Sequence, residues 1–473
     1  MAQFIIGHLA GGLQVVSMQK FFRHIDLHVE DFVEDLQTFC KQPSISAQNK
    51  GIDECVQLLK EMMAEAEIDT KVVPVKDGNP VVFGELKSEG AKQTLGFYNH
   101  YDVQPPEPLE LWDSPPFEAK VMEGKIFARG VEDNKGSLIA RLEAVKALKA
   151  VYGRLPVNLK FFVEGEEEIG SPHLESFVKG NMSLLKADGY VWEGDGVDEQ
   201  NRPNVSLGVK GILYVEFRAK GPQRDVHSSL APVVPNPAWR LVWLLASLKG
   251  PDEKIRIPGW YDEVVPPTEK EAQLLKEAPF DEKADKEELG LKEYLHGVTG
   301  FESQKILRFS PTCNVAGFEA GYTGPGAKTV LPSEAMVKVD FRLVEAQKPD
   351  LQFRRLKEHL RSQGFDDVTV INHGGYEPAK TPLENPFVTR VIETAEKVYG
   401  CKPVVWPTVA GTSPIYVIKN WMRIPVASAG GVGYPGSKVH APNENIRIKD
   451  YVNSIKFVAA LIRSYETLPY AHG

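Results

Sequence analysis

Cysteine is scarce in this chain, with four residues among 473. They are scattered at Cys40, Cys55, Cys313 and Cys401, and no two of them form a C-x-x-C pair. This spacing argues against a disulfide framework and against a zinc site built from thiolates. We therefore expect a reducing compartment and a cytoplasmic protein.

Long runs of one residue type are also missing. No apolar run approaches the roughly 18–20 residues that a membrane span needs, so we expect no membrane segment. Acidic and basic residues are interspersed without a long basic run, and the formal net charge is −9, so nucleic acid is not an expected partner. The moderately apolar stretch 4–18 lacks the basic start of a signal peptide, and we interpret residues 1–20 as an N-terminal extension.

The composition is that of an ordinary globular protein, with 42% hydrophobic and 25% charged residues, over a length that predicts two or more domains. Short apolar runs at 94–99, 157–163 and 189–192 indicate strands. Apolar residues at helical spacing indicate one helix over 54–68 and an amphipathic helix around 138–148. Strands that alternate with helices predict a largely parallel sheet covered on both faces.

The pattern changes in the middle of the chain. Alternating strands at 212–219 and 335–344, with helices at 238–248 and 353–360, indicate a separate α+β block. Between these elements, we interpret the charged segment 251–304 as a surface insertion.

The α/β pattern returns from Asn385, with a helix, a strand around Val426 and a last helix around 452–462. We therefore predict an α/β protein whose mostly parallel mixed sheet, flanked by helices, is interrupted by a smaller two-layer α+β domain. The predicted boundaries are the extension at 1–20, a first domain in two parts at 21–208 and 383–473, and a second domain at 209–382.

The motif Asn99-His100-Tyr101-Asp102 directly follows an apolar strand. On a strand, residues i and i+2 share a face, so His100 and Asp102 point the same way. A carboxylate beside a metal-bound imidazole fixes its tautomer and orientation. Taken alone, a histidine at a strand end is more often an ordinary polar loop residue.

Two acidic motifs follow further along the chain. Asp133, in the stretch 129–136, precedes a helix, where an acidic residue by itself usually serves as a cap. The cluster Glu164-Gly165-Glu166-Glu167-Glu168 directly follows the strand that ends at Val163. Acid clusters are normally solvated, but ligands of open α/β sheets bind at the carboxyl ends of strands, which makes this cluster a candidate site.

Glu193 and Asp195 follow the next strand, and His440 follows the glycine-rich segment 429–433. Singly, each is more often structural. Together, five histidine or carboxylate clusters occur, four of them at or just beyond strand ends of one interrupted domain. Imidazole and carboxylate ligands without thiolate suit zinc, manganese or cobalt in a hydrolytic role. Several carboxylates also carry enough negative charge for two ions, and one of them can bridge the pair.

From about Phe21 to Ile462, the chain resembles the dinuclear-zinc metallopeptidases, a family that includes cytosolic non-specific dipeptidase, carnosinase and bacterial glutamate carboxypeptidase. The dipeptidase–carnosinase branch is the most similar. The most specific matching stretches are 99–105, 112–117, 129–136, 164–171 and 326–332.

The resemblance implies two divalent ions per subunit, with zinc expected and manganese or cobalt as alternatives. The ligands that it implies are His100 for the first ion, Asp133 bridging both ions, and Glu168 and His440 for the second. The remaining ligand of the first ion is an Asp in the similar dipeptidases. Here the matching stretch offers Glu193, which fits the strand end better than Asp195.

Further roles come from the same resemblance. Glu167 would be the general base that takes a proton from water activated by the two ions and delivers it to the leaving amine. Asp102 would orient His100. His227 would reach a substrate oxygen from the partner subunit, which implies a homodimer and makes the interrupting domain a lid and dimerisation domain. The implied substrate contacts are Arg342, which would bind a carboxylate, and Thr329, Thr412 (with Ser413 as an alternative) and His373.

The implied function is hydrolysis of the amide bond of a dipeptide or very short peptide. An N-acyl amino acid deacylase or desuccinylase would share the metal site and the base, and would differ mainly in the interrupting domain. A non-catalytic metal-binding or peptide-binding protein is disfavoured, because pure binding has no need for Glu167 beside Glu168.

Overall fold

The computed structural model describes residues 18–465, which divide into two compact units. The first unit contains the described residues up to Leu207, Thr381–Pro407 and the residues from Val417 onward, and the second contains Gly208–Lys380 and Thr408–Tyr416. Of the predicted N-terminal extension, residues 1–17 lie outside the described residues, and residues 18–20 begin a helical stretch that runs to residue 27. Within the described chain, no helix is long and apolar enough to span a membrane.

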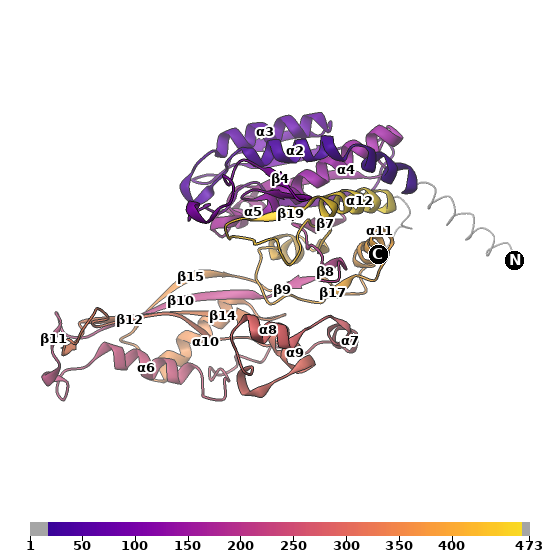
Figure 1. The fold of residues 1–473 in the computed structure, drawn as a ribbon. Helices are drawn as coiled ribbons and strands as arrows, with labels where there is room; N and C mark the ends of the chain where they lie inside the picture. The colour runs from indigo at the N-terminus through magenta and orange to yellow at the C-terminus, as the bar shows by residue number, and fades with distance from the viewer. Residues whose placement is uncertain (1–17, 466–473) are drawn as a thin grey trace. The chain divides into compact units, whose positions relative to one another are not determined.

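The first unit is built on an eight-stranded mixed sheet (Figure 1). In spatial order, its strands are β1 (Asp69–Val73), β2 (Val81–Leu86), β6 (Asn158–Glu164), β3 (Thr94–His100), β7 (Gly189–Trp192), β18 (Val426–Ala429), β8 (Asn204–Ser206) and β17 (Val404–Trp406). The pairs β6–β3, β3–β7, β7–β18 and β8–β17 are parallel, and the remaining pairs are antiparallel. The predicted α/β class with a mostly parallel mixed sheet is confirmed.

Helices cover both faces of this sheet. They are α2 (Val29–Lys41), α3 (Ile52–Glu65), α4 (Ser137–Tyr152), α5 (Leu174–Leu185), α11 (Pro386–Tyr399) and α12 (Ile448–Tyr465). Successive side chains of a strand point to opposite faces. On one face, Phe97 stacks on Phe161 at 5.3 Å, and Arg141 of α4 lies over the Phe97 ring. On the other face, Phe162 stacks on Phe177 of α5 at 5.4 Å.

Helix α4 differs from its prediction as an amphipathic helix. Nearly every residue from Ser137 to Leu148 is buried, including Arg141 and Glu143. The reason is that α12 packs along α4 and covers the side that would otherwise face water. A smaller sheet of β4 (Lys120–Met122), β5 (Lys125–Phe127) and β19 (Asn445–Arg447) completes the unit.

The second unit contains a four-stranded antiparallel sheet. Its order is β12 (Asn314–Ala320), β14 (Glu334–Leu343), β10 (Gly211–Lys220) and β15 (Thr369–Tyr376). Every second residue of β14 is buried, and the sheet packs on α6 (Pro237–Leu248) and α10 (Pro349–Ser362). This arrangement confirms a two-layer α+β fold. Two short ladders join β11 (Val226–His227) to β13 (Val330–Leu331) and β9 (Gly208–Val209) to β16 (Ala379–Lys380).

The interpretation of 251–304 as a surface insertion is wrong for its first part. Ile255, Ile257 and Trp260 belong to the core of the second unit, where the Trp260 ring lies 4.7 Å from that of Phe341. The sequence did not predict their burial, because the segment is rich in charged residues and these apolar residues are spaced too irregularly to indicate a helix or a strand. The rest forms α7 (Glu269–Glu277), α8 (Glu282–Glu288) and the start of α9 (Gly300–Phe309).

Candidate metal centre

Neighbouring parallel strands carry the predicted residues at their carboxyl ends. His100 is the last residue of β3 and lies opposite Glu164, the last residue of β6, while Glu193 directly follows β7. Because parallel strands end at the same edge of a sheet, these groups meet there. Asp133 comes from the irregular turn Val131–Gly136 before α4, and His440 comes from the loop before β19.

Asp133 lies between two imidazoles. Its Oδ1 is 2.9 Å from Nε2 of His100, and its Oδ2 is 3.1 Å from Nε2 of His440, which is also 3.1 Å from Oε2 of Glu168. Ligand atoms of His100, Asp133 and Glu168 all lie within 4.8 Å of one another. Asp133 does not cap α4, because that helix starts without a side-chain cap. A carboxylate whose two oxygens face different imidazoles is arranged as a bridging ligand would be.

Asp102 contacts both the acidic turn after β6 and the imidazole of His100. Its Oδ1 accepts a hydrogen bond from the backbone nitrogen of Glu167 at 3.2 Å, and its Oδ2 accepts one from that of Glu168 at 3.1 Å. Nδ1 of His100 lies 3.0 Å from the Asp102 carbonyl oxygen and 3.5 Å from Oδ1. Asp102 and His100 are both fully buried. Asp102 therefore contacts the imidazole of His100 and also holds the acidic turn that follows β6.

Hydrogen bonds inside the cluster shift the pKa values of its members. Hydrogen bonds to Asp133 and Glu168 raise the pKa of His440 to about 10. Burial opposes charge on His100, but hydrogen bonds to Asp102 and Asp133 raise its pKa well above the usual value. Burial would raise the pKa of Asp133, yet hydrogen bonds from both histidines lower it. Each imidazolium proton occupies a lone pair that a cation would use, so metal binding is coupled to proton release.

Glu167 has the electrostatics of a base that works near neutral pH. Burial raises its pKa to about 7; His100 opposes this shift, and the carboxylates of Asp133 and Glu168 add to it. A carboxylate tuned to this range can both take and return a proton at physiological pH.

Glu193 lies closer than Asp195 to the charges of this cluster. Burial raises the pKa of Glu193 well above its usual value, with Glu167 adding to the shift and His100 opposing it. Burial also raises the pKa of Asp195 to about 6, and its hydrogen bonds are with Ser206. Oε1 of Glu193 and Oδ2 of Asp195 are both buried without a hydrogen-bond partner.

The side chains present fit divalent cations. The donors are imidazole nitrogens and carboxylate oxygens without thiolate, which suits zinc and related hydrolytic ions. The unpaired Oε1 of Glu193 is a buried acceptor that a cation would satisfy. Asp133 presents one oxygen toward His100 and the other toward His440, so the set suits a pair of ions.

Glu444 is a residue next to the candidate centre that the sequence reasoning missed. Its buried carboxylate pairs with Arg129 at 2.7 Å and accepts hydrogen bonds from the backbone nitrogens of Gly130, Glu132 and Asp133 at 2.8, 2.9 and 3.2 Å. Glu444 lies in the loop that carries His440, so it joins the two loops that bring Asp133 and His440 together. A lone acidic residue in a loop has no spacing pattern, and no sequence signal pointed to it.

The predicted substrate contacts and His227 lie in the second unit and form three side-chain pairs. The pairs are Nη1 of Arg342 with Oγ1 of Thr412 (2.6 Å), Nε2 of His227 with Oγ1 of Thr329 (3.1 Å), and Nε2 of His373 with Oε2 of Glu216 (3.1 Å). In β14, Arg342 stands between Phe341 and Leu343, which are both buried. Its side chain therefore points to the opposite face of the strand, which the helices leave uncovered. Their contact with substrate remains a prediction.

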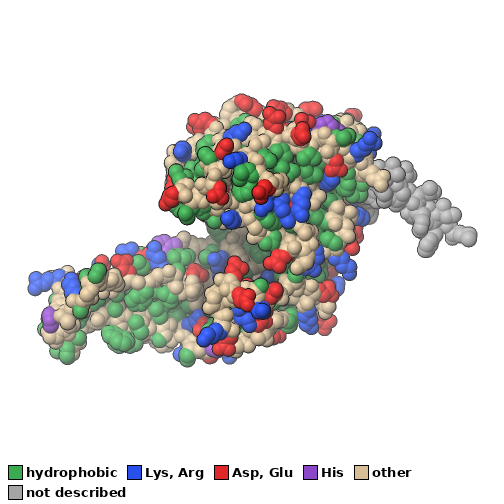
Figure 2. All heavy atoms as spheres, viewed as in Figure 1, with side chains coloured by type: hydrophobic (Ala, Val, Ile, Leu, Met, Phe, Trp, Pro, Cys, Tyr) green, Lys and Arg blue, Asp and Glu red, His purple; other side chains and the backbone are tan. Residues whose placement is uncertain are grey.

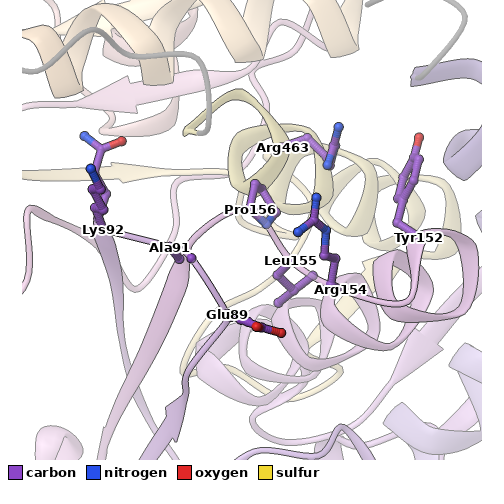
Figure 3. Close-up of a pocket in the computed structure, with 10 residues that line it drawn as sticks. Glu89, Ala91, Lys92, Tyr152, Arg154, Leu155, Pro156 and Arg463 are labelled. Atoms are coloured by element: carbon purple, nitrogen blue, oxygen red, sulfur yellow. The ribbon is translucent and has the colours of Figure 1, made fainter.

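A cavity of about 510 Å³ in the first unit lies away from the candidate centre (Figure 3). Residues 89–93 line it just before β3 starts, and Tyr152 and Arg154–Pro156 line it just before β6 starts, with Arg463 of α12. It therefore sits at the amino ends of the strands, whereas the predicted ligands sit at their carboxyl ends. None of the predicted site residues lines it.

Comparison with known proteins identifies a matching family over most of the chain. Residues 96–464 match peptidase family M20/M25/M40. The Beta-Ala-His dipeptidase of Mus musculus is 29% identical, with 94% of each chain covered. The Cys-Gly metallodipeptidase dug1 of Schizosaccharomyces pombe is 27% identical, with 94% of this chain and 98% of that protein covered.

Solved structures give the same result. The chain is similar to an M20 family metallo-carboxypeptidase, Sso-CP2 from Sulfolobus solfataricus, with 42% identity, a TM-score of 0.87, and 92% of this chain and 99% of that chain covered. It is also similar to human carnosine dipeptidase 1, with 27% identity, a TM-score of 0.77, and 95% and 99% of the two chains covered. The resemblance to metallopeptidases that the motifs indicated is confirmed.

Proposed function

The chain belongs to peptidase family M20/M25/M40, and from this premise we propose that it is a metallopeptidase that hydrolyses the amide bond of dipeptides or very short peptides. The observation that carries the proposal is Asp133 placed between His100 and His440, with the buried carboxyl group of Glu167 in the same charged cluster. Two relatives are named for dipeptides, and one similar structure is described as a carboxypeptidase. Substrates of a dipeptidase and of a carboxypeptidase share a free C-terminal carboxylate, and a short peptide can serve as either.

The proposed centre holds two divalent ions, with zinc expected and manganese or cobalt as alternatives. Asp133 would bridge them, with His100 and Glu193 on one side and Glu168 and His440 on the other. The electrostatic coupling of Glu193 to His100 and Asp133 supports its choice over Asp195, whose hydrogen bonds are with Ser206. Ions bound there would acidify a water molecule and polarise the substrate carbonyl.

Glu167 is the proposed general base. It accepts the proton of the attacking water and then delivers a proton to the nitrogen of the leaving amine. Asp102 supports this role, because its carboxylate holds the backbone nitrogens of Glu167 and Glu168 and keeps the turn in place.

Arg342 is proposed to bind the substrate carboxylate, since a guanidinium can form two parallel hydrogen bonds with a carboxylate. Thr412 already accepts a hydrogen bond from Arg342 and would help to orient it. His227 with Thr329 is proposed to reach a substrate oxygen, and His373 is proposed as a further contact. Free carboxylate recognition favours short peptides with an unblocked C-terminus.

A homodimer is part of the proposal, and the second unit carries two features in its support. Trp239 and Trp243 of α6 are each 57% exposed and stack at 6.0 Å, and Figure 2 shows hydrophobic side chains gathered in this region. Among the described residues, β12 pairs with β14 only, so its other edge is unpaired, and Val315 and Phe318 of this strand have exposed side chains. A second copy would supply the same helix face and the same strand edge, so one two-fold contact would cover both.

A reducing, cytoplasmic location also belongs to the proposal. All four cysteines are free, and three of them are buried. Disulfides are rare in reducing compartments, so free thiols fit such a location.

The proposal is tested with a panel of substrates and a chelator. The purified enzyme is assayed on dipeptides, tripeptides, C-terminally amidated dipeptides, and acetyl- and succinyl-amino acids, and its metal content is measured by mass spectrometry. We expect about two ions per subunit, hydrolysis of dipeptides with free carboxylates, and loss of activity on chelation that zinc restores. Preferred cleavage of acyl-amino acids would assign the chain to the deacylases instead, and unchanged hydrolysis after complete metal removal would contradict the mechanism.

A further inference from the structure

Arg141 is a fully charged side chain in the middle of a buried helix. It is 1% exposed, and its guanidinium lies over the ring of Phe97, 5.2 Å from the ring centroid. Arginine is almost never buried to this extent unless its charge and its donors are matched by the surroundings. An apolar side chain in this position would continue the packing of α4 without that cost, so the contacts of the guanidinium need an explanation.

The guanidinium binds oxygen atoms next to two predicted ligands. Its Nη1 donates to the carbonyl oxygen of Tyr98 at 2.5 Å and to Oδ1 of Asn99 at 2.5 Å. Its Nη2 donates to the carbonyl oxygen of Glu193. Asn99 directly precedes His100 in β3, so a single side chain ties the end of β3 to the residue that follows β7.

Asn99 extends this link to a third predicted ligand. Its amide nitrogen donates to Oδ1 of Asn134, which directly follows Asp133. Asn99 and Asn134 are both buried, at 0% and 3% exposure. The chain of contacts Asn134–Asn99–Arg141–Glu193 therefore runs beside the three residues proposed to hold the first ion. Of the ligands proposed for the second ion, it adjoins only the bridging Asp133.

Glu193 is the ligand that most needs such support. Its backbone has a φ of 27°, in a region that residues other than glycine rarely adopt. The next residue has to be glycine, because a Cβ on Gly194 would lie 2.7 Å from the Cα of Gly431. The hydrogen bond from Arg141 to the Glu193 carbonyl thus stabilises the strained turn from which the Glu193 side chain projects.

We propose that Arg141 is a positioning residue for the first metal ion, the one held by His100 and Glu193, and that it acts on this ion more strongly than on the second ion, which shares only the bridging Asp133. The inference rests on the proposed dinuclear function. The planar guanidinium is required, because it reaches three acceptors in fixed directions, whereas a lysine ammonium at the same place has a point charge on a flexible stem. Burial opposes the positive charge of Arg141, and Glu193 is the acidic group that favours it.

The test measures zinc binding to metal-free protein. Wild type, Arg141→Met and Arg141→Lys are titrated with zinc in competition with a chromophoric chelator, and thermal unfolding of each metal-free protein is followed by circular dichroism. The matched control is Glu143→Gln, which changes a buried acidic side chain of the same helix; Glu143 pairs with Lys146 at 2.8 Å and touches none of the ligands.

Wild type should bind two ions. Arg141→Met should hold one ion with wild-type affinity and the other about 10–100-fold more weakly, the range for lost support of a metal ligand, and Arg141→Lys should fall between. In a Glu193→Gln background, Arg141→Met should weaken the remaining ion no further. Glu143→Gln should lower the unfolding temperature and keep both affinities.

Equal weakening of both ions, or two wild-type affinities in a folded Arg141→Met protein, overturns the inference. If Arg141→Met does not fold, Arg141→Lys is judged by the same two criteria. A wild-type protein that binds no zinc and cleaves no peptide overturns the proposed function itself, and this outcome is distinct because it appears before any variant is made.

Discussion

Asp133 and His440 are 307 positions apart in the chain, yet Nε2 of His440 lies 3.1 Å from Oδ2 of Asp133. The contact joins the loop before α4 to the loop before β19. Glu444, in the second of these loops, links them again by accepting a hydrogen bond from the backbone nitrogen of Asp133. In the metal-free protein this pair is an ionic hydrogen bond, and in the proposed metal-bound protein both residues would be ligands. The same two side chains therefore link stability to pH and to metal.

The first prediction concerns metal-free stability. Hydrogen bonds raise the folded pKa of His440 to about 10, above its ordinary 6.5. Because the folded pKa is the higher one, His440 contributes stability that is fully present below pH 6.5 and is lost as the pH rises through about 10. The unfolding temperature of metal-free wild type should therefore exceed that of His440→Gln at pH 6.5, and the difference should shrink by pH 10. Differential scanning fluorimetry across this range measures it, and a difference independent of pH would contradict the assigned pair.

The strand-end residues could be predicted because they depend on local pattern. An apolar run followed by a histidine or an acidic residue marks the end of a buried strand, and parallel neighbours bring such ends to one edge. His100, Glu168 and Glu193 were placed by this argument. The pairing of Asp133 with His440 came from family resemblance, since no spacing relates two loops so far apart.

Glu444 and Arg141 could not be predicted, for a physical reason that they share. Each is a charged residue whose burial depends on what packs around it. Arg141 would face water on an amphipathic helix, and it is buried only because α12 covers α4. Sequence periodicity reports which side of a helix is apolar, but it does not report whether another element covers the polar side.

The second prediction concerns Glu167 as the base. Glu167→Gln should keep both ions and the fold, and kcat should fall by about 10²–10⁴-fold, the contribution of a positioned general base. Glu166→Gln is the matched control, because Glu166 lies in the same turn but binds Nδ1 of His173 at 2.8 Å. Steady-state kinetics and metal analysis measure both. Near-normal turnover by Glu167→Gln would assign the base elsewhere.

The third prediction concerns the Arg129–Glu444 pair. Both side chains are 1% exposed, so Glu444→Gln leaves a buried guanidinium without its counter-charge. The free energy of unfolding should fall by about 3–5 kcal/mol in urea titrations. The double variant Arg129→Met with Glu444→Gln should recover part of this loss, because it removes the unpaired charge. Strict additivity of the two single effects would show that the pair does not act as a unit.

The fourth prediction concerns substrate recognition by Arg342. Arg342→Lys should raise KM by about 10–100-fold for a dipeptide with a free carboxylate, because lysine lacks the bidentate fork, and kcat should change less. A C-terminally amidated dipeptide supplies the control, since wild type and variant should then have similar KM values. Equal losses on both substrates would mean that Arg342 does not bind the carboxylate. Thr412→Val should give a smaller effect in the same direction, because its hydroxyl only orients the guanidinium.

The last prediction concerns sharing of residues across a dimer. His227→Ala and Asp133→Asn should each be nearly inactive alone, for different reasons: the first lacks a substrate contact and the second lacks the bridging carboxylate. If His227 serves the partner's site, a mixed dimer contains one complete site, made of the metal ligands of one subunit and His227 of the other. Equal mixing with subunit exchange should then restore about a quarter of wild-type activity, because half of the dimers are mixed and each has one working site.

Replacing Trp239 and Trp243 by serine in both subunits should abolish this recovery, since it removes the exposed pair on α6 that we assign to the interface. Sedimentation of the tryptophan variant checks that it is monomeric and folded. No recovery in a mixture shown to contain mixed dimers would place His227 in the site of its own subunit, whereas recovery by the monomeric tryptophan variant would separate activity from dimerisation altogether.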